Sequence, residues 1–374
     1  MLATPDPVGG LYAGLMSGTS LDGVDAALVR FEGDAPRLLA LEHRPMPSTL
    51  RARLLAASRA GGDGLDEIGP IAIELAGLYA DAVEATLRAS RHSATEVVAI
   101  GCHGQTLRHR PESGYTVQVV NAALLAERCG IDVVCDFRSA DVAAGGQGAP
   151  LAPAFHAAAL AHPERARVVL NLGGIANVTS LAPGQPVRGF DTGPASMLLD
   201  GWAQRHLGTP FDRDGDWARS GRLLPGLLDR LLADAWFERP PPRSAGREQF
   251  DLPWLEACLS GDEAPADVQA TLLGLTARSV ARAIAAYVPG ADEVLVCGGG
   301  ARNRALMAAL AIECAPARVA PVDELGVSAE AVEALAFAWL ARQHVLGRPG
   351  NRPEVTGARG PRVLGARYPA PRPA

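Results

Sequence analysis

Short apolar runs alternate with longer amphipathic segments along this chain, and the apolar runs end in turns rich in glycine and polar residues. Strands are expected at residues 97–100, 131–135, 168–170 and 293–297. Apolar residues recur at helical spacing in residues 71–88, 151–160, 268–287, 304–314 and 329–342. This alternation predicts a layered α/β architecture, in which ligands bind at the carboxyl ends of the strands.

A β-hairpin is expected near the N-terminus, with strands at residues 11–15 and 26–31. The connecting turn is rich in Gly, Thr and Ser, so its backbone N–H groups and hydroxyls can approach a polyphosphate closely. Asp22 and Asp25 stand beside the turn, where carboxylates could hold Mg²⁺ or its waters. Taken alone, the same residues are also typical of an ordinary hairpin.

A chain of 374 residues exceeds one ordinary hydrophobic core and is expected to form two lobes. Because a strand followed by glycine recurs in each half, the two lobes are expected to be similar. We place the first lobe at residues 1–140 together with a C-terminal segment of about 340–374, and the second at residues 141–339. The chain is expected to change lobe between residues 136 and 168.

The charged residues exclude several classes of protein. The net charge of −6 provides no field that would recruit nucleic acid or a membrane surface. All 35 basic residues are arginine, so a lysine-containing phosphate loop, a protein-kinase lysine and a pyridoxal Schiff base are excluded. ATP, if it is bound, must be held by glycine-rich backbone, arginine and Mg²⁺.

The six cysteines are scattered without a C-x-x-C pair, which argues against a metal site or a disulfide framework. The first ten residues lack a basic segment and an apolar core, and no apolar run approaches the length of a membrane span. The expectation is therefore a soluble protein of a reducing cytoplasm.

Two polar clusters follow expected strands in the first half of the chain. His103 and Gln105 lie in a Gly-Cys-His-Gly-Gln-Thr loop and are suited to hydrogen-bond sugar hydroxyls, although a capped loop with a satisfied histidine is the alternative. Arg138, with Asp141, precedes a glycine-rich run at residues 145–148. Its guanidinium can clamp a carboxylate with two hydrogen bonds, or it can form an ordinary surface ion pair.

The second half carries a Gly-Phe-Asp-Thr-Gly-Pro segment that contains Asp191. Aspartic proteases need two Asp-Thr-Gly or Asp-Ser-Gly triplets, and the chain has one, so that class is excluded; an ordinary turn remains possible. Gly173-Gly174 and the Gly298–Gly300 run with Asn303 are expected to bind anions through free amides. Glu333 lies on a helix with an apolar face, so it is a candidate sugar contact, although a solvated glutamate is the simpler interpretation.

These segments together resemble the anhydro-N-acetylmuramic acid kinases, a family within the actin-, Hsp70- and hexokinase-like ATPases. Seven of them occur in the same order between Gly14 and about Gly365, so the resemblance covers nearly the whole chain. It implies an α/β, two-lobed actin/hexokinase-like (RNase H-like) ATPase fold with a central cleft. It also implies ATP and Mg²⁺ as cofactors and a homodimer, for which the helix at residues 268–287 could supply the interface.

The resemblance implies roles for particular residues. Asp191 would be the catalytic base, and Asp22 could contact Mg²⁺. The residues implied in ATP binding are Gly18, Thr19, Ser20, Leu21, Asp22, Gly23, Val24, Asp25, Gly173, Gly174, Gly298, Gly299, Gly300 and Asn303. The residues implied in sugar binding are His103, Gln105, Arg138, Asp141 and Glu333, with Arg138 on the lactyl carboxylate.

The implied reaction opens 1,6-anhydro-N-acetylmuramic acid with water and phosphorylates O6, giving N-acetylmuramic acid 6-phosphate and ADP in peptidoglycan recycling and amino-sugar metabolism. One alternative is a conventional hydroxyl kinase for an amino sugar, in which Asp191 would deprotonate a sugar hydroxyl. The other is a sugar-binding sensor without turnover. The chain departs from the family pattern at Ala195-Ser196, where Gly-Asn is usual, and at Val120, where glycine is usual. These departures bear on substrate range and turnover more than on reaction class.

Overall fold

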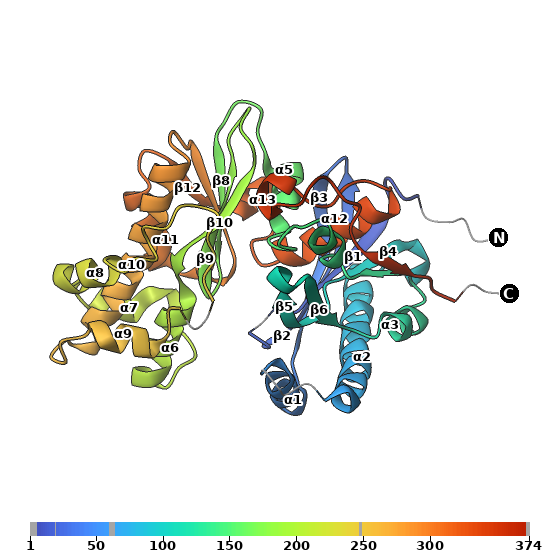
Figure 1. Ribbon diagram of the computed structural model, residues 1–374, viewed down its shortest axis with the longest axis horizontal. Coiled ribbons are helices and arrows are strands. Elements are labelled where there is room, and N and C mark those ends of the chain that lie inside the picture. The colour runs from blue at the N-terminus through green and yellow to red at the C-terminus, as the bar shows by residue number, and fades with distance from the viewer. Residues whose placement is uncertain (1–5, 19, 60–63, 247–248, 372–374) are drawn as a thin grey trace. The chain divides into compact units, whose positions relative to one another are not determined.

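The computed structural model describes residues 6–18, 20–59, 64–246 and 249–371 (Figure 1). The chain forms two compact units: Met1–Ala159 with Ala331–Ala374, and Leu160–Glu330. The change at 159/160 falls inside the interval 136–168 predicted from the sequence. Residues 141–159 and 331–339, which the sequence analysis assigned to the second lobe, belong to the first unit because they pack on its own sheet and C-terminal segment.

The first unit is built on a six-stranded sheet with the order β13-β7-β4-β1-β2-β3. The strands β1, β4 and β7 are parallel, and β2, β3 and β13 run antiparallel to their neighbours. Their bounds are Leu11–Met16 for β1, Gly23–Glu32 for β2, Ala35–Pro45 for β3, Val97–Cys102 for β4, Val133–Cys135 for β7 and Ala366–Tyr368 for β13. A separate hairpin joins β5 (Gln105–Arg110) to β6 (Tyr115–Val119).

Helices cover both faces of this sheet. Ala13 and Leu15 of β1 belong to the core that contains the apolar side of α2, whereas Gly14 contacts α12. Because neighbouring residues of a strand point to opposite faces, α2 and α12 lie on opposite sides. The helices of the unit are α1 (Ser48–Ser58), α2 (Leu65–Ser90), α3 (Ala122–Cys129), α4 (Ser139–Ala143), α5 (Ala152–Leu160, whose last residue begins the second unit), α12 (Val332–Val345) and α13 (Pro353–Thr356).

Two glycines allow α12 to lie directly on the sheet. A Cβ added at Gly14 of β1 would overlap the carbonyl oxygen of Ala334, and a Cβ at Gly101 of β4 would overlap that of Phe337. Both partners belong to α12, so the helix backbone touches the strands where they lack side chains. This close packing brings the start of α12, and with it Glu333, to the end of the sheet from which the β1–β2 turn projects.

The second unit has a five-stranded sheet with the order β10-β9-β8-β11-β12. Here β8, β11 and β12 are parallel, while β9 and β10 are antiparallel to their neighbours. The bounds are Arg167–Leu172 for β8, Ile175–Leu181 for β9, Arg188–Pro194 for β10, Glu293–Cys297 for β11 and Arg318–Pro321 for β12. In both sheets the first five strands, counted along the chain, therefore stand in the order third, second, first, fourth, fifth, and the first sheet adds β13 at its edge. The prediction of two similar α/β lobes is confirmed.

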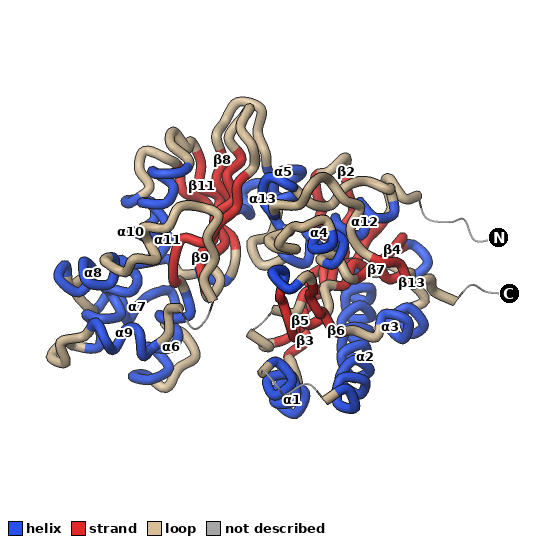
Figure 2. Tube along the Cα trace, viewed as in Figure 1, coloured by secondary structure: helices blue, strands red, loops and turns tan. Residues whose placement is uncertain are grey.

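Six helices of the second unit lie beside its sheet (Figure 2) and contribute side chains to one hydrophobic core. They are α6 (Ser196–Leu207), α7 (Asp216–Ser220), α8 (Pro225–Leu232), α9 (Leu252–Cys258), α10 (Pro265–Tyr287) and α11 (Arg304–Glu313). The central one is α10, whose Val268, Leu272, Leu275 and Val280 are completely or almost completely buried. The sequence analysis offered this helix as a dimer interface. These four side chains pack inside the unit, whereas Ala285 and Ala286 of the same helix are exposed, and the dimer interface remains a prediction.

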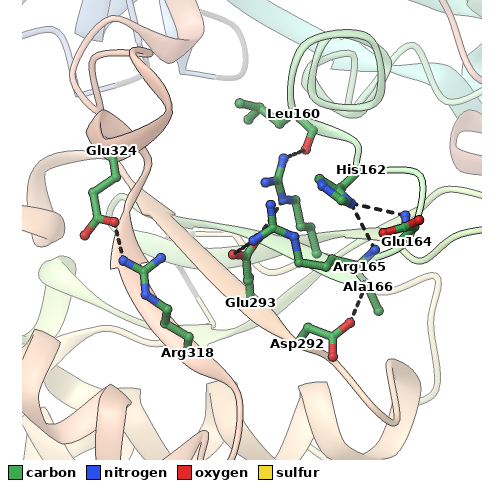
Figure 3. Close-up of polar contacts among 10 residues, drawn as sticks. Leu160, His162, Glu164, Arg165, Ala166, Asp292, Glu293, Arg318 and Glu324 are labelled. Atoms are coloured by element: carbon green, nitrogen blue, oxygen red, sulfur yellow. Dashed lines mark hydrogen bonds and ion pairs between the residues drawn. The ribbon is translucent and has the colours of Figure 1, made fainter.

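A buried ion pair ties the sheet to the end of α5 (Figure 3). Arg167 and Glu293 face each other on β8 and β11, and Arg167 Nε donates to a Glu293 carboxylate oxygen over 2.7 Å. The other carboxylate oxygen accepts from Arg165 over 2.6 Å. Arg167 also donates to the carbonyl oxygen of Leu160 over 2.8 Å, which caps the last turn of α5. In the part of the chain that the structure describes, no helix is long and apolar enough to cross a membrane.

Candidate active site

The turn between β1 and β2 is a tight polar tip on the first sheet. Leu21 adopts a left-handed conformation with φ of 55°, and its N–H donates to the carbonyl oxygen of Gly18 over 3.3 Å. Asp22 Oδ1 accepts from the Ser20 hydroxyl over 2.8 Å and from the Gly23 N–H over 3.0 Å. The predicted phosphate loop is therefore a true hairpin tip with polar groups on its surface. Thr19, also predicted to bind ATP, lies outside the described residues.

The remaining residues predicted in this loop contribute unequally. The side chains of Leu21 and Val24 are buried in the core, so only their backbone can face a ligand. Asp25 Oδ1 lies 2.8 Å from the Nδ1 atom of His43. Asp22 is consequently the carboxylate of this turn that is not engaged with a basic side chain among the described residues.

Residues that follow β4 hold the β1–β2 turn through hydrogen bonds. Gln105 is buried and donates its side-chain N–H to the carbonyl oxygen of Gly18 over 3.2 Å. Ser17, at the end of β1, shares a hydrogen bond of 2.7 Å with the hydroxyl of buried Tyr79. The predicted sugar contact of Gln105 remains a prediction, since its amide nitrogen is used to hold the turn.

His103 and Arg138 form a close pair beside this loop. The Nε2 atom of His103 accepts from Nη2 of Arg138 over 2.9 Å and from Nε over 3.3 Å. Arg138 Nη1 donates to the carbonyl oxygen of Gly148 over 2.8 Å. Burial and the Arg138 charge lower the pKa of His103 to about 3, so the imidazole is neutral and orients the arginine as an acceptor. Burial also lowers the pKa of Arg138 to about 10.

Arg138 keeps donors for a ligand. A guanidinium has five N–H groups, and the contacts above use three of them. One N–H remains on each terminal nitrogen with no acceptor among the described residues. Two such groups can bind one carboxylate, so the geometry is compatible with the predicted clamp.

Asp141, which was predicted to contact the sugar, lies inside the first unit. It is fully buried, and its Oδ1 accepts from Asn351 and from Thr356, each over 2.7 Å. Its Oδ2 accepts from the N–H of Gly148, also over 2.7 Å. We correct the predicted sugar contact on this ground: Asp141 fixes the glycine-rich turn and the C-terminal segment, and the turn in turn holds Arg138 through Gly148.

Glu333 lies in the first turn of α12 and is exposed to solvent. Its pKa is nevertheless raised, first by the loss of hydration among surrounding protein atoms and then by the charge of Asp25; Arg138 acts in the opposite direction. These neighbours show that the first unit gathers Glu333, Arg138 and the β1–β2 turn into one region. The predicted sugar contact of Glu333 remains a prediction.

Asp191 lies on β10, the edge strand of the second sheet. The N–H of Ala245 donates to its Oδ2 over 2.8 Å, and no described residue donates to Oδ1. Burial raises the pKa of Asp191 to about 6, against the opposing effects of the Ala245 N–H and the Arg243 charge. A half-buried carboxylate with one oriented oxygen and one available oxygen is suited to act as a general base near neutral pH.

The Gly173-Gly174 turn joins β8 to β9. Its carbonyl oxygens accept the N–H groups of Ala195, Ser196 and Met197 over 2.9 to 3.2 Å. The start of α6 is thereby satisfied by this turn. The departures at Ala195 and Ser196 fall where the backbone makes these bonds, and the bonds are present with the residues of this chain.

The Gly298–Gly300 turn lies against β8. Gly298 has φ of 80°, and a Cβ on Gly300 would press on the Leu172 side chain, so both positions require glycine. Asn303 caps α11, because its Oδ1 accepts from the N–H of Leu306 over 3.0 Å. This cap uses the N–H of Leu306, and the anion-binding role predicted for the turn and for Asn303 remains a prediction.

A divalent cation would find few protein ligands here. In the described ranges, no group of three or more His, Cys, Asp or Glu side chains is placed to hold a metal ion. Asp22 offers a hard oxygen at the phosphate turn, which fits Mg²⁺, since this ion is usually held by one or two carboxylates together with phosphate oxygens and water.

The residues that hydrogen-bond to Asp191 were not predicted from the sequence. Nothing in the composition of the stretch from Arg243 to Ala245 shows that it lies beside residue 191. The structure places it there through three hydrogen bonds.

Comparison with known proteins agrees with this arrangement. The family model described as anhydro-N-acetylmuramic acid kinase matches residues 10–370. A protein of that name from Bordetella petrii is 58% identical over 97% of both chains. Another from Thiobacillus denitrificans is 53% identical over 99% of this chain and 100% of its own. A third, from Nitrosomonas europaea, is 50% identical over 96% of this chain and 99% of its own.

These matches place the chain among the sugar kinases, in agreement with two α/β units of one topology. Within that class, the chain belongs to the anhydro-N-acetylmuramic acid kinase family.

Proposed function

We propose that this protein opens 1,6-anhydro-N-acetylmuramic acid with water and transfers the γ-phosphoryl group of ATP to its O6 atom. The products are N-acetylmuramic acid 6-phosphate and ADP. Membership of the family supports this reaction, and so does the Asp191 carboxylate, which is ready to accept a proton at one oxygen while Ala245 holds the other.

The substrate explains why a kinase carries such a carboxylate. In the anhydro sugar, O6 is bonded to C1, so no free hydroxyl can accept phosphate. Asp191 takes a proton from a water molecule as that water attacks C1, and the C1–O6 bond breaks. The released O6 attacks the γ-phosphorus, and the bond to the β-phosphate oxygen breaks, so that ADP leaves. The water supplies the new hydroxyl at C1, and Asp191 passes its proton to solvent.

The first unit contributes residues that bind and orient. Backbone N–H groups of the β1–β2 turn bind phosphate oxygens, and Arg138 binds the lactyl carboxylate through its two remaining N–H groups. Glu333, His103 and Gln105 face the sugar. Asp22 would hold Mg²⁺, and the ion would neutralise charge on the phosphates.

We further propose that the enzyme works as a homodimer in the cytoplasm, in peptidoglycan recycling. None of the six cysteines forms a disulfide bond, which suits a reducing compartment.

The proposal is tested by supplying Mg²⁺-ATP with the anhydro sugar or with open amino sugars and measuring ADP and phosphosugar. Turnover with the anhydro sugar is expected, and the Asp191→Asn variant should abolish most of it. Turnover restricted to open sugars would mean a conventional hydroxyl kinase. Binding of sugar with no ADP from any substrate would mean a sensor.

A further inference from the structure

Arg243 is the second residue on which the proposed base depends. We propose that Arg243 is a positioning residue that fixes the backbone of Asp191 and sets the charge around its carboxylate, without touching the substrate itself. This inference rests on the proposed role of Asp191 as the general base. It adds a residue whose loss should change turnover and pH dependence while leaving the binding of ATP intact.

The first observation concerns the edge of the sheet. On one side β10 pairs with β9, where Asp191 stands opposite Asn177. On the other side no strand formed by the described residues follows, and Arg243 lies there instead. The N–H of Asp191 donates to the carbonyl oxygen of Arg243 over 3.1 Å, and Arg243 Nε donates to the carbonyl oxygen of Asp191 over 2.9 Å. The main chain and the side chain of Arg243 thus satisfy both backbone polar groups of Asp191.

This support is placed where the strand is least regular. The register between β10 and β9 shifts between Asp191 and Gly193, and Gly193 has φ of 146°. A bulge of this kind leaves a strand locally without its regular ladder and redirects the side chain beside it. Next to this bulge, Arg243 holds the backbone of Asp191 from the opposite, edge side of β10. Two residues further on, the Ala245 N–H fixes Oδ2 of Asp191.

The guanidinium is itself held firmly. Its Nη1 donates to the carbonyl oxygens of Phe237 and Arg239, each over 2.8 Å. Its carbon lies 4.8 Å from the centre of the Trp236 ring and 5.8 Å from that of Phe190. Arginine suits this site because its planar, delocalised cation stacks on aromatic rings and also donates to fixed carbonyl groups. A lysine ammonium could supply the charge, but its N–H groups could not reach the same carbonyl oxygens in the same directions.

The charge of Arg243 acts on Asp191 as well. Arg243 is the charged side chain, among the described residues, that shifts the pKa of Asp191, and it lowers that pKa against the effect of burial. The titratable groups that act on Arg243 in turn are Tyr287, Asp191 and Glu238. Position and charge are therefore two separable contributions of one residue.

Two variants separate these contributions. Arg243→Lys keeps the charge and loses the geometry, so kcat should fall roughly 10- to 100-fold while the acid limb of the kcat–pH profile stays in place. Arg243→Gln also removes the charge, so the acid limb should in addition move upward by about one pH unit. The KM for ATP should change less than about twofold in both variants, because Arg243 acts on Asp191 and is not proposed to contact ATP.

Arg230→Lys is a matched control. Arg230 also donates its Nε–H to a backbone carbonyl, that of Cys258, over 2.9 Å, but its other partners are Ser260 and Glu263 rather than Asp191. Its kcat and pH profile should equal those of the unchanged protein.

The outcomes distinguish the inference from the proposed function. If Asp191→Asn is inactive while both Arg243 variants keep the kcat and pH profile of the unchanged protein, the positioning role is wrong and the base stands. If Asp191→Asn keeps normal turnover, the proposed base itself fails. If the Arg243 variants lose folded protein in thermal unfolding and raise the KM for ATP in proportion, Arg243 is merely structural.

Discussion

The backbone N–H of Ala245 donates a hydrogen bond of 2.8 Å to Oδ2 of Asp191, a residue 54 positions earlier in the chain. This contact orients the carboxylate and leaves Oδ1 without a donor among the described residues. It also opposes the effect of burial, which raises the pKa of the carboxyl. The chemistry that we propose for Asp191 follows from this one-sided contact.

Removing the charge of Asp191 should remove the base. Asp191→Asn keeps an oxygen that can accept from Ala245 but cannot take a proton from water, so kcat should fall roughly 10²- to 10⁴-fold. Steady-state assays with the anhydro sugar measure this loss. Asp200→Asn is the control, because burial also raises the pKa of Asp200 to about 6, yet that residue lies on α6 and is placed in no catalytic role. Equal losses in both variants would contradict the assignment.

The same variant should be more stable than the unchanged protein near neutral pH. A carboxyl whose pKa is about 6 in the folded state and about 4 in the unfolded state binds more protons when folded, so its contribution to stability falls as pH rises through this window. Asparagine removes this penalty. Thermal unfolding should show a higher Tm for Asp191→Asn at pH 8 and a much smaller difference at pH 4. A lower Tm at pH 8 would show that the carboxylate is stabilising.

Arg138 should govern the affinity for the sugar. Arg138→Lys keeps a positive charge but cannot bind His103, Gly148 and a carboxylate in one plane, so the KM for the sugar should rise roughly 10- to 100-fold, as for loss of a charged hydrogen bond. The KM for ATP should change little. A substrate analogue that lacks the carboxylate provides the check, because it should not distinguish the variant from the unchanged protein.

Gly14 should be needed for the packing of α12. Gly14→Ala places a methyl group against the carbonyl oxygen of Ala334, so it should lower the free energy of unfolding by about 3 kcal/mol, the upper end of overpacking effects. Urea denaturation measures the change. Gly69→Ala is the control, since Gly69 lies within α2 and a Cβ there meets no atom within 4 Å. That substitution should be neutral or stabilising. A neutral Gly14→Ala would contradict the close contact.

The sequence predicted those parts of the fold that depend on local pattern. Strand β11 begins and ends at Glu293 and Cys297 as expected, and the strands of the N-terminal hairpin pair as β1 and β2. Short apolar runs between glycine turns carry this information because a buried strand needs apolar residues throughout. Strand β10 was missed, because Asp-Thr-Gly-Pro is typical of a turn and the bulge at Asp191 cannot be seen from composition.

The parts of the site that depend on distant contacts could not be predicted. Asp141 was expected to face the sugar, and the residues that bury it, Asn351 and Thr356, come more than 200 positions later. The role of Arg243 depends in the same way on a contact across 52 positions with Asp191. The family pattern identified which segments matter, whereas the three-dimensional packing decides which of their residues act on a ligand and which support their neighbours.

The most direct test of the proposed reaction traces the oxygen atom that water adds to C1. The protein is incubated with Mg²⁺-ATP and 1,6-anhydro-N-acetylmuramic acid in ¹⁸O-water, and the phosphosugar is weighed by mass spectrometry before its anomeric carbon exchanges with solvent. The account predicts one solvent oxygen at C1 in each molecule of N-acetylmuramic acid 6-phosphate. A phosphosugar formed without solvent oxygen would contradict it, because water would then not be the nucleophile that Asp191 activates.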